Sequence, residues 1–116
     1  MTALPQLTGR LFLTDGGLET TLIFHDGIEL PCFASIVMLR TAEGRAHLAR
    51  YFERYLAIAR SAGTGFILES ATWRAGPDWA APLGLTMAEL DALNRDAIAM
   101  VHQLRGAHGS GGPPIL

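Results

Sequence analysis

Apolar residues recur at helical spacing in two long stretches of the chain. Across residues 42–62 an apolar position returns every three or four residues, while arginines and glutamates occupy the other faces. The stretch from Leu90 to Leu104 repeats this pattern, and Thr86 to Glu89 before it has the form of a capping box. We therefore predict two amphipathic helices, the first ending at Gly63 and the second at Arg105–Gly106.

Shorter continuous apolar runs predict buried strands at residues 10–14 and 66–69, and residues 113–116 resemble the start of a third. A helix between two apolar strands is typical of a βαβ unit with a parallel sheet. The alternation of strands and helices, with long connections after the strands, predicts an α/β fold made of the N-terminal β/α units of a (β/α)8 TIM-type barrel. A complete barrel takes about 250 residues, so we expect it to be incomplete in this chain.

Composition narrows the class of protein. The chain has 116 residues with 49% hydrophobic and 17% charged residues, which predicts a globular protein with one modest core. Its net charge of −2 gives no reason to expect nucleic acid or an anionic membrane as a partner. All nine basic residues are arginines, which excludes lysine Schiff-base chemistry within these residues. No apolar run approaches the ~20 residues of a membrane span. The single cysteine excludes an internal disulfide, which fits a cytoplasmic location.

An acid follows each of the first two predicted strands. Asp15 is followed at once by Gly16 and Gly17, and Glu69 by Ser70 and, two residues later, Thr72. An acid at the carboxyl end of a buried strand, next to backbone that can approach a ligand closely, is the layout of an α/β active-site edge. Two alternatives stay open: Asp15 can close an ordinary Asp-Gly turn, and Glu69 can cap or brace the first loop.

Three segments together carry a resemblance to a known family. The stretches Asp15-Gly16-Gly17-Leu18-Glu19-Thr20, Leu30-Pro31 and Ile67-Leu68-Glu69-Ser70-Ala71-Thr72-Trp73 resemble the N-terminal part of homocysteine S-methyltransferase domains, in order and spacing. The resemblance implies that residues 1–116 are the N-terminal part of a homocysteine-binding barrel domain, truncated at the start of the third strand. Members of the family transfer a methyl group to the homocysteine thiol, forming methionine, on a zinc ion held by three cysteines. The implied partners are homocysteine and a methyl donor.

The resemblance also implies roles for individual residues. It places Asp15 against the homocysteine ammonium, with Gly16 and Gly17 permitting close backbone approach. It places Glu69, Ser70 and Thr72 on the same face as further substrate-binding residues. It assigns no separate role to Glu19, Thr20, Trp73, Arg74 or Trp79, although Arg74 can pair with Asp78 or Glu69.

No catalytic residue or zinc ligand of the family maps onto this chain. Cys32 does not match a zinc cysteine, and we interpret it as a buried, inert thiol. The four histidines, at positions 25, 47, 102 and 108, are too scattered to suggest a metal site. Zinc is therefore expected in a full-length family member and not in this segment.

We expect the chain alone to be inactive and to associate with itself or with a complementary C-terminal barrel half, because open strand edges and apolar helix faces favour association. Two other functions remain open. The chain can be a short, non-catalytic binding or dimerisation protein from a split or decayed gene. It can also begin a barrel lyase or isomerase that uses Asp15 and Glu69 as acid and base.

Overall fold

Two short parallel strands lie at the centre of the structure, a computed structural model that describes residues 3–116. Strand β1 (Phe12–Thr14) pairs with β2 (Gly65–Ile67) in the register Phe12↔Gly65, Leu13↔Phe66 and Thr14↔Ile67. The helices are α1 (Leu18–Thr20), α2 (Ala42–Ala62) and α3 (Met87–His108). A π-helical turn η2 (Thr21–His25) and the 3-10 turns η1 (Pro5–Leu7), η3 (Pro31–Phe33), η4 (Ser35–Arg40) and η5 (Pro77–Trp79) complete the fold.

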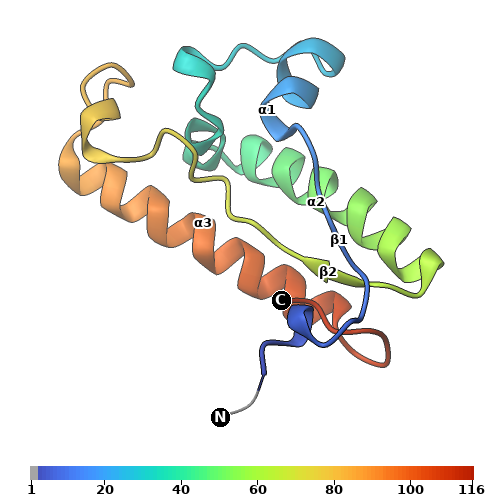
Figure 1. Cartoon of the computed structure of the whole chain (residues 1–116). Coiled ribbons are helices and arrows are strands. Elements are labelled where there is room, and N and C mark those ends of the chain that lie inside the picture. Colours follow the sequence, from blue (N-terminus) through green and yellow to red (C-terminus); the bar gives the residue numbers. More distant parts are fainter. Residues whose placement is uncertain (1–2) are drawn as a thin grey trace.

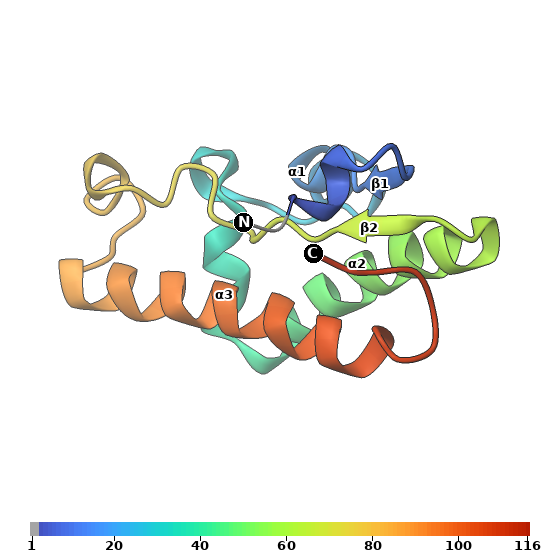
Figure 2. The same cartoon turned by 60° about the horizontal axis from the view of Figure 1, so that its bottom comes forward.

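The two long helices lie on one side of the strands and run in the same direction (Figures 1 and 2). The core is formed between these helices, η4 and the strands. Its largest fully buried side chains are Tyr51, Phe52, Phe66, Leu22, Ile36, Leu39 and Leu48. Because parallel partners project to the same face, Leu13 lies on the same face as the buried Phe66, and Phe12, Gly65 and Ile67 lie on the other.

Both predicted amphipathic helices are confirmed, together with the predicted Gly63 end of the first and the Thr86–Glu89 capping box of the second. The Thr41 side chain accepts a hydrogen bond from the Gly44 amide at 2.9 Å, and Gly63 ends α2 in the left-handed conformation with φ +68°. The Thr86 hydroxyl accepts from the Glu89 amide at 3.1 Å and lies 3.1 Å from the Glu89 carboxylate, so the capping pair forms. Helix α3 continues to His108, two residues past its predicted end.

The prediction of TIM-barrel β/α units is wrong for this chain. The structure is mostly helical and, within the described residues, its only sheet has two strands of three residues each. Residues 113–116 contribute an isolated bridge from Ile115 to Phe66 instead of a third strand. Pro114 accepts a hydrogen bond from the Phe66 amide but has no N–H to extend the ladder. Helical turns occupy most of the connection from β1 to α2, and the apolar positions are buried against η4, α2 and α3 instead of inside a closed barrel.

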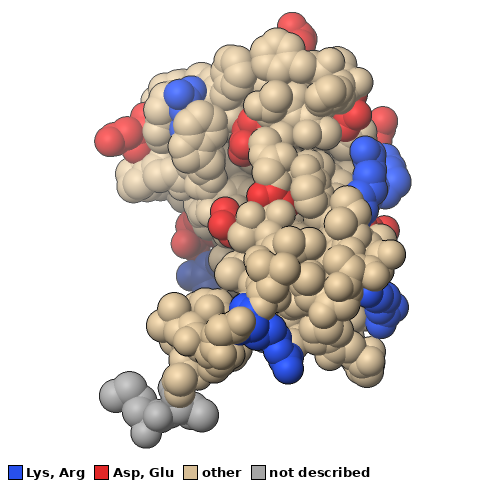
Figure 3. All heavy atoms as spheres, turned by 45° about the vertical axis from the view of Figure 1, so that its right-hand side comes forward, with Lys and Arg blue, Asp and Glu red and all other residues tan. Residues whose placement is uncertain are grey.

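Most of the surface shown in Figure 3 is uncharged, with acidic and basic side chains scattered over it. Several large apolar side chains are exposed on the molecule as a whole. They are Leu4, Leu7, Leu11, Phe24, Phe33, Ile58, Trp73, Met87 and Ile98.

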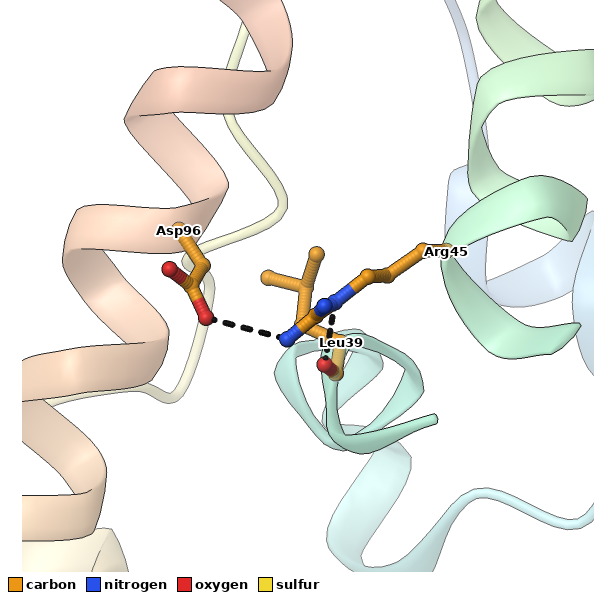
Figure 4. Close-up of polar contacts among 3 residues, drawn as sticks. All are labelled: Leu39, Arg45 and Asp96. Atoms are coloured by element: carbon orange, nitrogen blue, oxygen red, sulfur yellow. Dashed lines mark hydrogen bonds and ion pairs between the residues drawn. The ribbon is translucent and has the colours of Figure 1, made fainter. Parts of the chain in front are cut away.

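Helix α2 and η4 approach so closely that their backbones nearly touch. Gly44 is buried, and a Cβ atom added to it would overlap the backbone carbonyl of Met38 in η4. Beside this contact, Arg45 Nε donates to the Leu39 carbonyl at 2.8 Å and Arg45 Nη2 reaches Asp96 of α3 at 3.2 Å (Figure 4). One arginine at the start of α2 therefore links η4 and α3.

This close approach predicts opposite effects for the same substitution at two helical glycines. Gly44→Ala should destabilise the fold by about 1–3 kcal/mol, because the new methyl group displaces the η4 backbone. Gly106→Ala in α3 should stabilise it by up to about 0.5–1 kcal/mol, because a Cβ there meets nothing within 4 Å and alanine favours the helix. Urea unfolding of both variants measures this difference. Equal effects at the two sites would contradict the tight packing of α2 against η4.

Candidate functional site

Asp15 lies immediately after β1 and is held there by two tyrosines of α2. The buried Tyr51 hydroxyl donates to Asp15 Oδ2 at 2.8 Å and lies 3.3 Å from the Gly16 carbonyl. The Tyr55 hydroxyl donates to the same carbonyl at 2.9 Å. These bonds fix the carboxylate and the backbone that follows it against α2.

The backbone beside Asp15 is open and sharply turned. Gly17 has φ +70°, a left-handed conformation that glycine adopts without strain, and it leads into α1. A Cβ added at Gly16 would meet nothing within 4 Å, so the space next to this residue is free. One turn on, Glu19 accepts a hydrogen bond at 2.8 Å from the fully buried Ser35 hydroxyl. Glu19 thus braces the turn against η4 and is not a free acid.

The second group of predicted residues follows β2. The strand ends at Ile67, and Glu69 is exposed and makes no ion pair or side-chain hydrogen bond within residues 3–116. The Ser70 and Thr72 hydroxyls lie 2.9 Å apart and are half-buried. The ends of β1 and β2 emerge at the same edge because the strands are parallel neighbours, but no hydrogen bond in the described part of the chain joins the Asp15 group to the Glu69 group.

Sequence reasoning missed Tyr51 as a site residue. Its place in the apolar stripe of α2 suggested only core packing, and its ring is indeed 2% exposed. A buried tyrosine hydroxyl usually has a hydrogen-bond partner, so a tyrosine in the apolar stripe of a helix could have suggested a polar contact as well as packing. Burial, and then the neighbouring Asp15 carboxylate, raise the pKa of Tyr51 well above its ordinary value of 10.0. Tyr51 therefore stays a hydrogen-bond donor to Asp15 throughout the neutral range.

Arg74 pairs with neither Asp78 nor Glu69, in contrast to the partners suggested by the sequence. Its guanidinium carbon lies 4.3 Å from the ring centroid of Trp73 and 4.6 Å from that of Trp79. Its Nη1 donates to the Cys32 carbonyl at 2.7 Å. Arg74 thus joins the connection after β2 to the connection before η4.

A histidine–aspartate pair links α2 to the connection that follows η2. Asp26 Oδ2 lies 2.8 Å from Nε2 of His47, and both side chains are about four-fifths covered. The hydrogen bond with His47 holds the pKa of Asp26 below its ordinary value of 3.8.

The residues present do not fit a zinc ion. Among residues 3–116 no three histidine, cysteine or acidic side chains are grouped closely enough to hold a metal. Cys32, which we predicted to be buried, is half-buried instead. Across the same residues, no helix combines the length and apolar character needed to cross a membrane.

No family model, curated protein or solved structure matches this chain. The resemblance to homocysteine S-methyltransferases therefore stays a prediction that depends on the motifs around Asp15 and Glu69.

The bond between Tyr51 and Asp15 predicts that Asp15 makes ionisation of the Tyr51 hydroxyl less favourable. The chain contains two tyrosines, so Tyr51 is the sole tyrosine in a Tyr55→Phe background. Adding Asp15→Asn to that background should lower the pKa of Tyr51, because the negative charge is lost while the burial remains. Ultraviolet absorbance of tyrosinate during alkaline titration measures the change. An unchanged pKa would show that Asp15 does not contact this hydroxyl in solution.

The Asp26–His47 pair predicts a dependence of stability on acid pH. The pKa of Asp26 is lower in the folded state than in the unfolded state, so the ionised carboxylate stabilises the fold at pH values above the unfolded pKa. This stabilisation is lost as the pH falls through the lowered pKa of the folded state. The free energy of unfolding of the wild-type chain should therefore approach that of Asp26→Asn as the pH falls below about 4. Urea unfolding at several pH values tests this. A constant difference between the two proteins would contradict the pairing.

Proposed function

We propose that the chain binds the amino-acid part of homocysteine for an enzyme that transfers a methyl group to the homocysteine thiol, forming methionine. The observation that supports this proposal best is the fixed Asp15 carboxylate at an open glycine turn. The family resemblance, which rests on the motifs around Asp15 and Glu69, names the amino acid.

Asp15 has the properties that an ammonium site requires. Tyr51 occupies Oδ2, while Oδ1 makes no hydrogen bond within the described residues and is available to accept one. Charge-assisted hydrogen bonds between an ammonium and a carboxylate are about twice as strong as neutral ones. The carboxylate is half-buried and already oriented, so less conformational entropy is lost when a cation binds.

The substrate carboxylate has candidate donors at the same turn. The backbone N–H groups of Gly16 and Gly17 make no hydrogen bond within residues 3–116. The Ser70 and Thr72 hydroxyls, after the neighbouring strand, offer further donors. Because no Cβ stands at Gly16 or Gly17, a ligand can approach this backbone closely.

Methyl transfer itself requires groups that the described residues do not supply. The family's zinc site does not fit them, so our proposal for this chain covers recognition of the amino-acid end only. A cytoplasmic location, suggested by the single cysteine, belongs to the same proposal.

Asp15→Asn should weaken homocysteine binding by about tenfold or more, because the amide carries no charge to pair with the ammonium. Isothermal titration calorimetry with the purified chain measures the affinity. A homocysteine analogue that lacks the amino group should bind the wild-type chain and Asp15→Asn equally weakly. The matched control is Asp91→Asn, which makes the same change at an exposed position of α3 and should bind homocysteine as the wild type does.

Two results would contradict the proposal. The first is wild-type affinity for homocysteine in Asp15→Asn. The second is equal affinity of the wild-type chain for homocysteine and the analogue without the amino group. Retained binding with lost turnover in an active, longer protein would instead identify Asp15 as a general base.

A further inference from the structure

Arg74 is a cation that lies against two indole rings and keeps donors accessible to solvent. The indole rings of Trp73 and Trp79 lie against its guanidinium at 4.3 Å and 4.6 Å. One N–H of Nη1 is used by the Cys32 carbonyl at 2.7 Å. Nε and Nη2 make no hydrogen bond within the described residues, and no buried side-chain nitrogen there lacks a partner, so both atoms are in contact with solvent. The free edge of the guanidinium is thus a row of solvent-exposed donors.

This cation has no anionic partner in the described part of the chain. Its residue is half-buried, yet none of the ion pairs among residues 3–116 includes it. The two arginines that do pair with acids among these residues, Arg45 and Arg95, have more exposed side chains. A partly desolvated guanidinium without a counter-charge favours an anion more strongly than a fully solvated one does.

The backbone at this place is strained in both contacting segments. Arg74 has φ +57°, and Cys32 and Phe33 have φ +55° and +57°, although none of them is a glycine. Such left-handed conformations cost about 1–3 kcal/mol each, and they concentrate at ligand sites, where the surroundings hold them in place. Next to them, Trp73 is 55% exposed and Phe33 46% exposed.

We infer that Arg74, in cation–π contact with Trp73 and Trp79, is a binding site for the carboxylate group of a small molecule. A guanidinium edge offers two parallel N–H groups, which match the two oxygens of a carboxylate. A single arginine balances a single negative charge, whereas a phosphate site generally recruits several donors. This inference does not depend on the proposed function, because it requires no ammonium group and no homocysteine.

The tryptophans that flank Arg74 are the only two in the chain, so their fluorescence reports on this site. We would titrate the full chain with sodium acetate, exchanging it for chloride at constant ionic strength, and repeat the titration with inorganic phosphate. The expected result is a fluorescence change that saturates with acetate and needs higher concentrations of phosphate. A response without saturation, or half-saturation at a lower concentration of phosphate than of acetate, would overturn the assignment.

Two variants of Arg74 and one control variant test whether the fluorescence change arises from acetate binding at Arg74. Arg74→Gln should raise the half-saturating acetate concentration by about tenfold or more, because the charge is removed. Arg74→Lys, which keeps the charge and loses the paired N–H groups, should also bind more weakly than the wild type. Arg95→Gln, at an arginine whose side chain is 78% exposed on α3, should leave the titration unchanged. Wild-type half-saturation in both Arg74 variants would overturn the inference.

Discussion

The hydrogen bond from the buried Tyr51 hydroxyl to Asp15 is the interaction on which the arrangement of the candidate site depends. Strand β1 has only three residues, too few for the sheet alone to hold its end in place. Tyr51 and Tyr55, one helical turn apart on α2, bind the Asp15 carboxylate and the Gly16 carbonyl and so attach the strand end to a helix. The position of the site is therefore set by α2 more than by strand pairing.

Helix α2 also organises the rest of the molecule. Its first turn packs on η4 through Gly44, and the neighbouring Arg45 reaches both η4 and α3. In its second turn, His47 pairs with Asp26 and so holds the connection after α1 against the helix. Polar contacts made by one helix thus position the segments that surround Asp15, while Leu48, Tyr51 and Phe52 of the same helix are among the largest fully buried side chains of the core.

Local features of the sequence predicted the helices well and the sheet poorly. Periodic apolar positions, with Gly63 and Thr86 at two of the boundaries, define the helices locally, and the structure confirms them. The first two predicted strands form as β1 and β2, although each has only three residues. The barrel prediction failed because short apolar runs cannot specify how many neighbours a strand pairs with, which is a long-range property. Asp15 was located at a strand end from its motif, but its partner Tyr51, 36 positions away, could not be deduced from local pattern. The hydrogen bond from Arg74 to the Cys32 carbonyl likewise joins residues 42 positions apart.

A crystal structure of the chain with homocysteine would test the central claim most directly. Our account predicts the ligand's ammonium nitrogen within hydrogen-bond distance of Asp15 Oδ1, with Oδ2 still held by the Tyr51 hydroxyl. It would be contradicted by homocysteine bound with its ammonium away from Asp15, or by an Asp15 carboxylate that has left Tyr51 in the complex.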